Sequence, residues 1–324
     1  MNQKSFASRP GKILTVPASL LGVLATMFAT TAFVHRGFGP FDLESLALVA
    51  LPLALAALAQ MCVVIAGGID LSLGSVIALS NVVAARLMQD ADLSTSLLVA
   101  VLVLLVAVLC SCANAIISAV SGIPDVMVTL TTGFIYGGLA LLVLNQPGGG
   151  APDEFLSAVS GGLFDGWLPN ALLAIVVPVL LVWLPLRRSR LGLFMFAAGS
   201  DQVAALRSGT NPAHGRLIGF AAGGVFAALA GLSLTFTTGI GSPLGGSFYT
   251  LASVAAITLG GVSLQGGEGG PAGPIIASII LAFIPMLLIF VNIDPNYGQV
   301  IQGVILVLVV MIGGALGKRQ QRIN

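Results

Sequence analysis

Long apolar stretches alternate with short polar ones along nearly the whole chain. A helix needs about 20 mostly apolar residues to cross the hydrocarbon core of a bilayer. The pattern therefore predicts an all-α integral membrane protein, a bundle of about ten transmembrane helices. The expected spans are residues 13–34, 45–66, 69–88, 95–120, 126–145, 169–186, 215–239, 244–262, 272–291 and 298–316.

Two of these spans have poorly defined ends. Gly67-Gly68 precedes the span 69–88, Gly245-Gly246 interrupts the span 244–262, and polar residues adjoin both pairs. Because glycine is unfavourable inside a helix, the helix boundaries near 67–75 and 240–272 stay open.

Composition agrees with the membrane class. Of the 324 residues, 57% are hydrophobic and 8% are charged, whereas soluble domains carry about a quarter charged residues. We expect residues 1–324 to form a single transmembrane domain. The net charge of +1 gives no reason to expect nucleic acid as a partner. With three cysteines inside apolar runs and two distant histidines, we expect no metal site and no catalytic residues.

The basic residues indicate the orientation, because lysine and arginine favour the cytoplasmic side. Eleven of the thirteen fall in three clusters, which ten spans would place on one face. Both termini and a loop at about 187–214 are therefore predicted to be cytoplasmic, and the acidic loop at about 146–168 external. The clusters are Lys4, Arg9 and Lys12; Arg187, Arg188, Arg190, Arg207 and Arg216; and Lys318, Arg319 and Arg322.

The sequence has a weak internal similarity: residues 66–78 and 259–277 each contain a Gly-Gly pair followed by a further glycine. Residues 122–125 are likewise similar to residues 292–295. Transporters are often built from two similar halves. Here the two similar segments lie farther apart in the first half than in the second, so the relation between the halves stays open.

Asp70 is the only charged residue between Glu44 and Arg86. An intramembrane carboxylate is costly and usually faces a cavity or a partner. The favoured interpretation is structural: Gly67-Gly68 ends one helix and Asp70 caps the next by accepting backbone N–H bonds. A direct role in the substrate path or a gate is the alternative.

The basic loop contains a short predicted helix at 199–209, with Ser200 or Asp201 as its N-cap and Gly209 as its stop. Such a helix is too short to be stable alone. A surface helix is one interpretation, and a docking element for a soluble partner is the favoured one. The glycine-rich stretch 260–271 lacks the lysine of a phosphate-binding loop, so we expect no nucleotide binding.

These segments together resemble the permeases of the ribose, xylose, arabinose and galactose group of ABC importers, and they cover about residues 60 to 280. The stretch 67–78 is similar to the Gly-Gly-Ile-Asp-Leu-Ser signature of that group, and 199–209 lies where the group has its coupling helix. The residues that carry the resemblance, and are candidates for the translocation path, are Gly67, Gly68, Asp70, Ser72, Gly74, Ser75, Ile123, Pro124, Thr129, Tyr136, Gly260 and Gly261. The coupling-helix candidates are Gly199, Ser200, Asp201, Gln202, Val203, Ala204, Ala205, Leu206, Arg207, Ser208 and Gly209.

The resemblance implies a permease domain with the fold of cobalamin-type importers, located in the bacterial inner membrane. It implies a second permease chain (identical or a sister), separate ATPase subunits that bind ATP and Mg, and a periplasmic sugar-binding protein. This chain would itself hold no cofactor and would not be an enzyme. It departs from the group at Gly137, which replaces an arginine, and at Gln202 and Val203, which replace two glutamates. These departures leave the sugar and the ATPase open. They strengthen the case for a heterodimer with a sister permease, although the choice between homodimer and heterodimer stays open.

A secondary transporter driven by an ion gradient is the main alternative. That class needs titratable residues within the membrane, and the chain offers little beyond Asp70. It would also give the helix at 199–209 no role.

Overall fold

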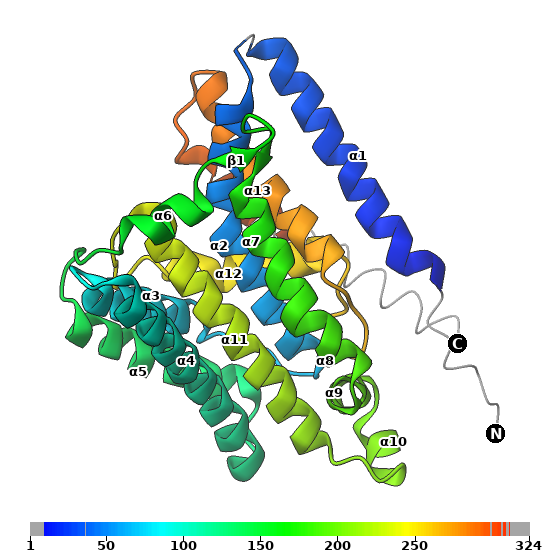
Figure 1. The fold of residues 1–324 in the computed structure, drawn as a ribbon. Helices are drawn as coiled ribbons and strands as arrows, with labels where there is room; N and C mark the ends of the chain where they lie inside the picture. Colours follow the sequence, from blue (N-terminus) through cyan, green and yellow to red (C-terminus); the bar gives the residue numbers. More distant parts are fainter. Residues whose placement is uncertain (1–9, 36, 299, 306, 309–310, 312–324) are drawn as a thin grey trace.

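The computed structural model describes residues 10–35, 37–298, 300–305, 307–308 and 311. Helices form nearly all of the regular structure in this part of the chain, with one small hairpin (Figure 1). The elements are α1 (Pro10–Val34), α2 (Pro40–Ile65), α3 (Leu73–Met88), α4 (Leu93–Ser121), α5 (Asp125–Val143), α6 (Asp153–Val159), β1 (Gly162–Leu163), β2 (Leu168–Pro169), α7 (Asn170–Pro178), the π-helix η1 (Val179–Trp183), α8 (Leu184–Arg188), α9 (Arg190–Ser200), α10 (Gln202–Arg207), α11 (Pro212–Thr238), α12 (Ser247–Leu259) and α13 (Ala272–Phe290).

Seven helical segments of the described chain are long and apolar enough to cross a membrane, which confirms an all-α membrane protein. They correspond to seven of the expected spans. The expected span 298–316 lies partly outside the described residues. The seven segments are Val16–Val34, Pro40–Ile65, Leu93–Ser121, Asp125–Val143, Asn170–Arg188, Pro212–Thr238 and Ala272–Phe290.

The other two expected spans are shorter than predicted. Helix α3 has 16 residues and α12 has 13, which gives lengths of about 24 and 20 Å at 1.5 Å per residue. The hydrocarbon core is about 30 Å thick. The span predicted to begin at residue 69 becomes helical only at Leu73, because residues 66–72 form a turn. The span predicted at 244–262 is helical only between Ser247 and Leu259.

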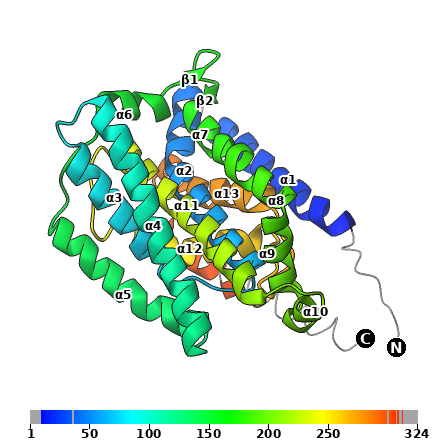
Figure 2. The same ribbon diagram turned by 60° about the horizontal axis from the view of Figure 1, so that its bottom comes forward.

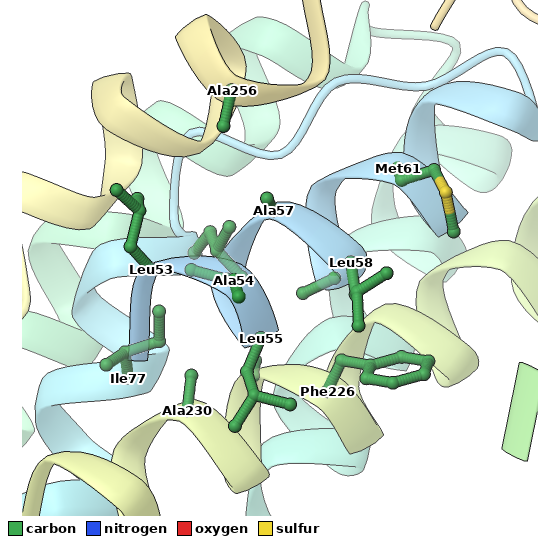
Figure 3. Packing of buried hydrophobic residues seen from close by; sticks show 14 of the residues in the cluster. Leu53, Ala54, Leu55, Ala57, Leu58, Met61, Ile77, Phe226, Ala230 and Ala256 are labelled. Carbon is green, nitrogen blue, oxygen red and sulfur yellow. The ribbon is translucent and has the colours of Figure 1, made fainter. Parts of the chain in front are cut away.

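Helix α2 forms the centre of the bundle. It is apolar all round and is buried continuously from Ala50 to Ile65, as expected for a helix surrounded by other helices. Figure 3 shows its side chains packed between helices from distant parts of the sequence, with Phe226 beside Leu58 and Ala256 on another side. This helix therefore positions the elements around it.

Glycines allow α11 to approach its neighbours closely. A Cβ on Gly223 would lie 3.1 Å from the carbonyl oxygen of Ala59 in α2, and one on Gly231 would lie 2.7 Å from that of Ile77 in α3. Small residues serve this purpose at helix contacts within membranes. The second long core helix is thus held against both α2 and α3.

The packing relates two groups of helices. Helix α2 packs on α12 and α13, α11 packs on α3 and α4, and α2 and α11 pack on each other. Both α2 and α11 are followed by a break and then by a short helix, α3 or α12. The group α2–α3–α4 therefore corresponds to α11–α12–α13. The sequence similarity between 66–78 and 259–277 does not follow this correspondence of helices and comes from a shared type of turn. Gly67 and Gly261 both have a positive φ and end their helices with the same pair of backbone hydrogen bonds.

The connecting segments lie at the ends of the bundle. Helix α6 and the hairpin β1–β2 belong to the acidic loop 146–168, and α10 lies at the opposite end (Figure 1). Helices α1 and α5 occupy opposite edges of the bundle in both views (Figures 1 and 2). The loop predicted at 187–214 contains the additional helix α9. The sequence reasoning missed this helix because Arg187, Arg188 and Arg190 marked the region as a cytoplasmic loop.

Candidate functional site at the break between α2 and α3

Helix α2 ends in a turn that requires glycine. Gly67 has φ +84°, and its N–H donates to the carbonyl of Val64 at 2.9 Å. The N–H of Gly68 then donates to the carbonyl of Val63 at 3.0 Å. This pair of bonds is a common helix stop, and glycine adopts a positive φ without steric cost. The chain leaves the helix here as residues 68–72, termed the Asp70 segment below.

Asp70 is buried and bonded within its own segment. Its side chain is 1% exposed, and its Oδ1 accepts from the Ser72 N–H at 2.8 Å and from the Ser72 hydroxyl at 2.6 Å. The Gln60 amide in α2, with its nitrogen toward the Asp70 carbonyl, can donate to that oxygen at 3.0 Å. Asp70 thus stabilises the turn that leads into α3. It is not the N-cap that the sequence predicted, because that position is occupied by Ser72, whose side chain makes no capping bond.

A chain of polar groups continues from Ser72 toward α5. The Asn114 amide of α4 donates to the Ser72 hydroxyl at 2.8 Å, and the Tyr136 hydroxyl of α5 lies 3.2 Å from Asn114 Oδ1. Tyr136 also donates to the Cys110 carbonyl at 3.0 Å. Sequence reasoning selected Tyr136 but missed Asn114, although a lone amide within an apolar span was an available signal.

Helix α5 holds the Asp70 segment through its buried face. The Leu71 N–H donates to the Thr129 hydroxyl oxygen at 2.9 Å. Gly133 lies against Ser72, where an added Cβ would be 3.3 Å from the Ser72 Cα. Burial recurs every three to four residues along α5, so one side faces α3 and α4 and the other faces outward.

The start of α3 meets the start of α12. A Cβ on Gly246 would overlap the Gly74 carbonyl oxygen and lie 2.7 Å from the Ala78 nitrogen. The Gly74 N–H donates to the Thr250 hydroxyl at 3.2 Å. Gly246 has φ −81°, so it is needed for space rather than for conformation. The two short helices therefore begin against each other inside the bundle.

Asn81 of α3 forms hydrogen bonds to the break between α11 and α12. Its amide donates to the Thr235 hydroxyl at 2.8 Å and to the Ile240 carbonyl at 3.2 Å, and its Oδ1 accepts from the Ser242 N–H at 2.6 Å. The side chain is fully buried. Sequence reasoning did not select Asn81, which satisfies the backbone where α11 gives way to α12.

Four glycines form a junction at the ends of α2 and α9. The Gly267 N–H donates to the Ile65 carbonyl at 2.9 Å. A Cβ on Gly199 would overlap that carbonyl oxygen and lie 2.7 Å from the Gly267 nitrogen. Gly266 contacts both Gly199 and Gly67. This glycine junction (Gly67, Gly199, Gly266 and Gly267) joins the end of α9 directly to the turn that precedes the Asp70 segment.

The short helix expected at 199–209 is present as α10. Asp201 is its N-cap, accepting from the Val203 and Ala204 N–H groups at 2.9 and 3.0 Å, and Gly209 follows with φ +81°. Ser200 instead ends α9. Val203 is 58% exposed and Leu206 61% exposed, so α10 presents an apolar face outward.

Other predicted residues lie apart from the Asp70 segment. Gly260 packs on the start of α13 and Gly261 on Val16 of α1. Ile123 and Pro124 are exposed between α4 and α5. The remaining predicted residues lie on their expected elements: Ser75 is half-buried at the start of α3, and Gln202, Arg207 and Ser208 are exposed on or beside α10.

A cavity of about 220 Å³ lies between α12, α13 and residues 302–303. Its lining is mostly apolar and includes Phe248, Leu251 and Gln302. None of the lining residues belongs to the Asp70 segment. No group of three or more histidine, cysteine or acidic side chains in the described chain could hold a metal ion.

Comparison with known proteins decides the family. The sequence model described as the permease component of branched-chain amino acid transport systems matches residues 43–310. The chain belongs to this permease family. It is a multi-pass protein of the bacterial inner membrane and the permease subunit of an ATP-binding-cassette importer, a transport component rather than an enzyme.

The similar proteins include two kinds of importer subunit. The ribose import permease of Haemophilus influenzae is 29% identical over 276 residues, covering 82% of this chain and 83% of the relative. The autoinducer 2 import system permease of Klebsiella pneumoniae is 31% identical over 299 residues, covering 90% and 84%. The ribose import permease of Escherichia coli K12 is 28% identical over 268 residues, covering 80% and 81%. No solved structure matches the chain.

Proposed function

We propose that this permease forms the translocation path for a small sugar, which a periplasmic binding protein delivers and separate ATPase subunits drive. The ribose and autoinducer 2 permeases among the similar proteins support this class of solute. One observation carries the mechanism. The glycine junction connects α9, and through it the exposed helix α10, to the turn before the buried Asp70 segment.

The proposal includes a specific architecture. About ten helices form the membrane bundle as in cobalamin-type importers, with the short α3 and α12 enclosed among the longer ones and both termini in the cytoplasm. The position of α10 at the end of the bundle opposite the acidic loop supports this orientation (Figure 1), because the segment around α10 is rich in arginine. Two permease chains pair, and the atypical Gln202 and Val203 favour a sister chain as the second. ATP and Mg bind the ATPase subunits.

Transport would follow from motion of α10. ATP-driven closure of the ATPases displaces α10 and α9, and the glycine junction passes this displacement to the end of α2. The Asp70 segment and the starts of α3 and α12 then rearrange. Packed helices respond by shifting between discrete arrangements rather than by deforming continuously.

Reconstitution tests the proposed function. The permease is placed in proteoliposomes with its ATPase and binding protein, and uptake of radiolabelled D-ribose is measured, or of the ligand that mass spectrometry finds in the binding protein. Uptake should require ATP and persist when ionophores collapse ion gradients. Uptake that needs a proton or sodium gradient and no ATP would instead establish the ion-coupled alternative.

The exposed face of α10 provides a prediction. Val203→Asp or Leu206→Asp should lower uptake at least tenfold and abolish co-purification of the ATPase, because a charge is introduced into a desolvated apolar contact. Ala205 is another of the coupling-helix candidates, but it is only 4% exposed and packs inward. His214→Ala, an exposed polar position in the first turn of α11 and outside the coupling-helix candidates, is the control. Full uptake by both aspartate variants would remove α10 from the docking surface.

The hydrogen bonds of Asp70 provide another testable prediction. Asp70→Asn should keep uptake within about twofold of wild type, because an amide oxygen can accept the same two bonds from Ser72. Asp70→Ala should lower the amount of folded protein, at a cost of about 1–3 kcal/mol for the unsatisfied buried donors. Uptake is compared at matched protein amounts. A well-folded but inactive Asp70→Asn chain would give the charge itself a role in the path.

A further inference from the structure

Arg216 of α11 and Asp125 of α5 form an ion pair beside the Asp70 segment. The Asp125 side chain is 7% exposed and that of Arg216 is 23% exposed. The Arg216 guanidinium also donates to the Ser118 hydroxyl of α4 at 3.3 Å, and Ser118 donates to the Ile123 carbonyl at 2.8 Å. The ends of three helices are thus joined by charged and polar groups.

This pair links two helices that share α3 and α4 as neighbours but do not pack closely on each other. Helix α5 packs on α3 and α4, whereas α11 packs on α2, α3, α4 and α9. The outer face of α5 is exposed, as at Phe134 and Leu142. Within the described residues, Arg216–Asp125 is the one salt bridge and the one side-chain bond between α5 and α11.

Each end of the pair connects to a different part of the machinery. Helix α11 follows α10 directly, and Asn211 between them caps α11 through the Ala213 N–H at 2.9 Å. At the other end, α5 holds the Asp70 segment through Thr129. Asp125 also lies over the same turn, where a Cβ on Gly68 would be 2.8 Å from its Oδ2.

A simpler role for Asp125 is to complement the positive end of the α5 helix dipole, since it is the first residue of that helix. That role needs no arginine. An exposed aspartate would serve it equally well, as Asp153 does at the first position of α6. The dipole therefore does not account for the burial of Asp125 or for its contact with Arg216.

We propose that the Arg216–Asp125 pair is a coupling tie, which makes the first turn of α5 follow α11 during transport. It gives the displacement of α10 a second route to the Asp70 segment, through α11 and α5, parallel to the glycine junction. The inference rests on the proposed function, because it takes α10 as the element that the ATPase moves. Arg216 and Asp125 are positioning residues that need not touch the solute.

The test compares Asp125→Asn, Arg216→Gln and the reversed pair Asp125→Arg/Arg216→Asp. Each is reconstituted with the ATPase and the binding protein, using D-ribose or the ligand identified in that binding protein. The decisive quantity is the number of ATP molecules hydrolysed per molecule imported. Each single variant should raise it about tenfold, within the range by which residues between coupled sites modulate coupling. The reversed pair should recover most of the coupling.

Asp153→Asn is the matched control, because it neutralises an aspartate at the same helix position away from the tie. Single variants that keep the wild-type ratio would overturn the tie. So would single variants that lose hydrolysis, uptake and thermal stability together without recovery in the reversed pair, since that result marks a purely structural pair. Wild-type uptake that needs no ATP would overturn the proposed function first, and the coupling role with it.

Discussion

Replacing Gly199 with alanine should abolish uptake and destabilise the protein by about 2 kcal/mol or more, within the usual cost of overpacking a close contact. Alanine is better than glycine inside a helix by about 1 kcal/mol, and Gly199 lies within α9. Helix propensity alone would therefore predict a gain. The added Cβ, however, would overlap the Ile65 carbonyl and crowd the Gly267 nitrogen at 2.7 Å. Backbone atoms on both sides cannot rotate away.

Gly270→Ala is the control for this experiment. Gly270 lies in the glycine-rich loop that also holds Gly267, and a Cβ there meets nothing within 4 Å. It should leave uptake and thermal stability unchanged. Uptake is measured in proteoliposomes, and stability is followed by thermal unfolding of the purified protein in detergent. A stable and fully active Gly199→Ala chain would show that α9 does not act on the end of α2 through this contact.

Replacing Gly246 with alanine should have a comparable effect through a different contact. Its Cβ would overlap the Gly74 carbonyl and lie 2.7 Å from the Ala78 nitrogen. The start of α12 would have to move away from α3, which would lengthen the 3.2 Å bond from the Gly74 N–H to Thr250. We expect uptake to fall at least tenfold, equivalent to about 1.4 kcal/mol, together with a lower unfolding temperature.

Gly138→Ala tests whether any new methyl group in a membrane helix would do the same. Gly138 lies in α5, and a Cβ there meets nothing within 4 Å. It should raise the unfolding temperature slightly through helix propensity. If Gly246→Ala behaved like Gly138→Ala, the approach of α3 to α12 would not be essential for folding or for transport.

The spans show where sequence patterns suffice. Helices such as α4 and α11 were predicted within a few residues, because the cost of exposing backbone polar groups to lipid makes a long apolar run helical whatever surrounds it. The short helices α3 and α12 were predicted too long. Their apolar residues continue into turns, and those turns are stable only because Asn81 and Thr129 satisfy the backbone from other helices.

The candidate site was predicted in part. Gly67, Asp70, Thr129 and Tyr136 were selected from the sequence, and the structure brings them together at one break. The ATPase-docking role of α10 stays a prediction, although the Asp201 cap that the sequence indicated is present. The partners that complete the network come from segments that no local pattern connects to position 70. These are Asn114, Asp125, Arg216 and Gly246.

By itself the sequence determined that this protein is a helical membrane protein, where most helices run, and that residues 67–75 and 199–209 differ from ordinary apolar spans. These properties depend on local composition and on the bilayer as solvent. Only the tertiary structure decided that Gly199 must be glycine, since its φ is ordinary and the constraint is the Ile65 backbone 134 positions away in sequence. Close packing joins residues that are remote along the chain, so the proposed coupling of α10 to the Asp70 segment depends on contacts that local patterns do not encode.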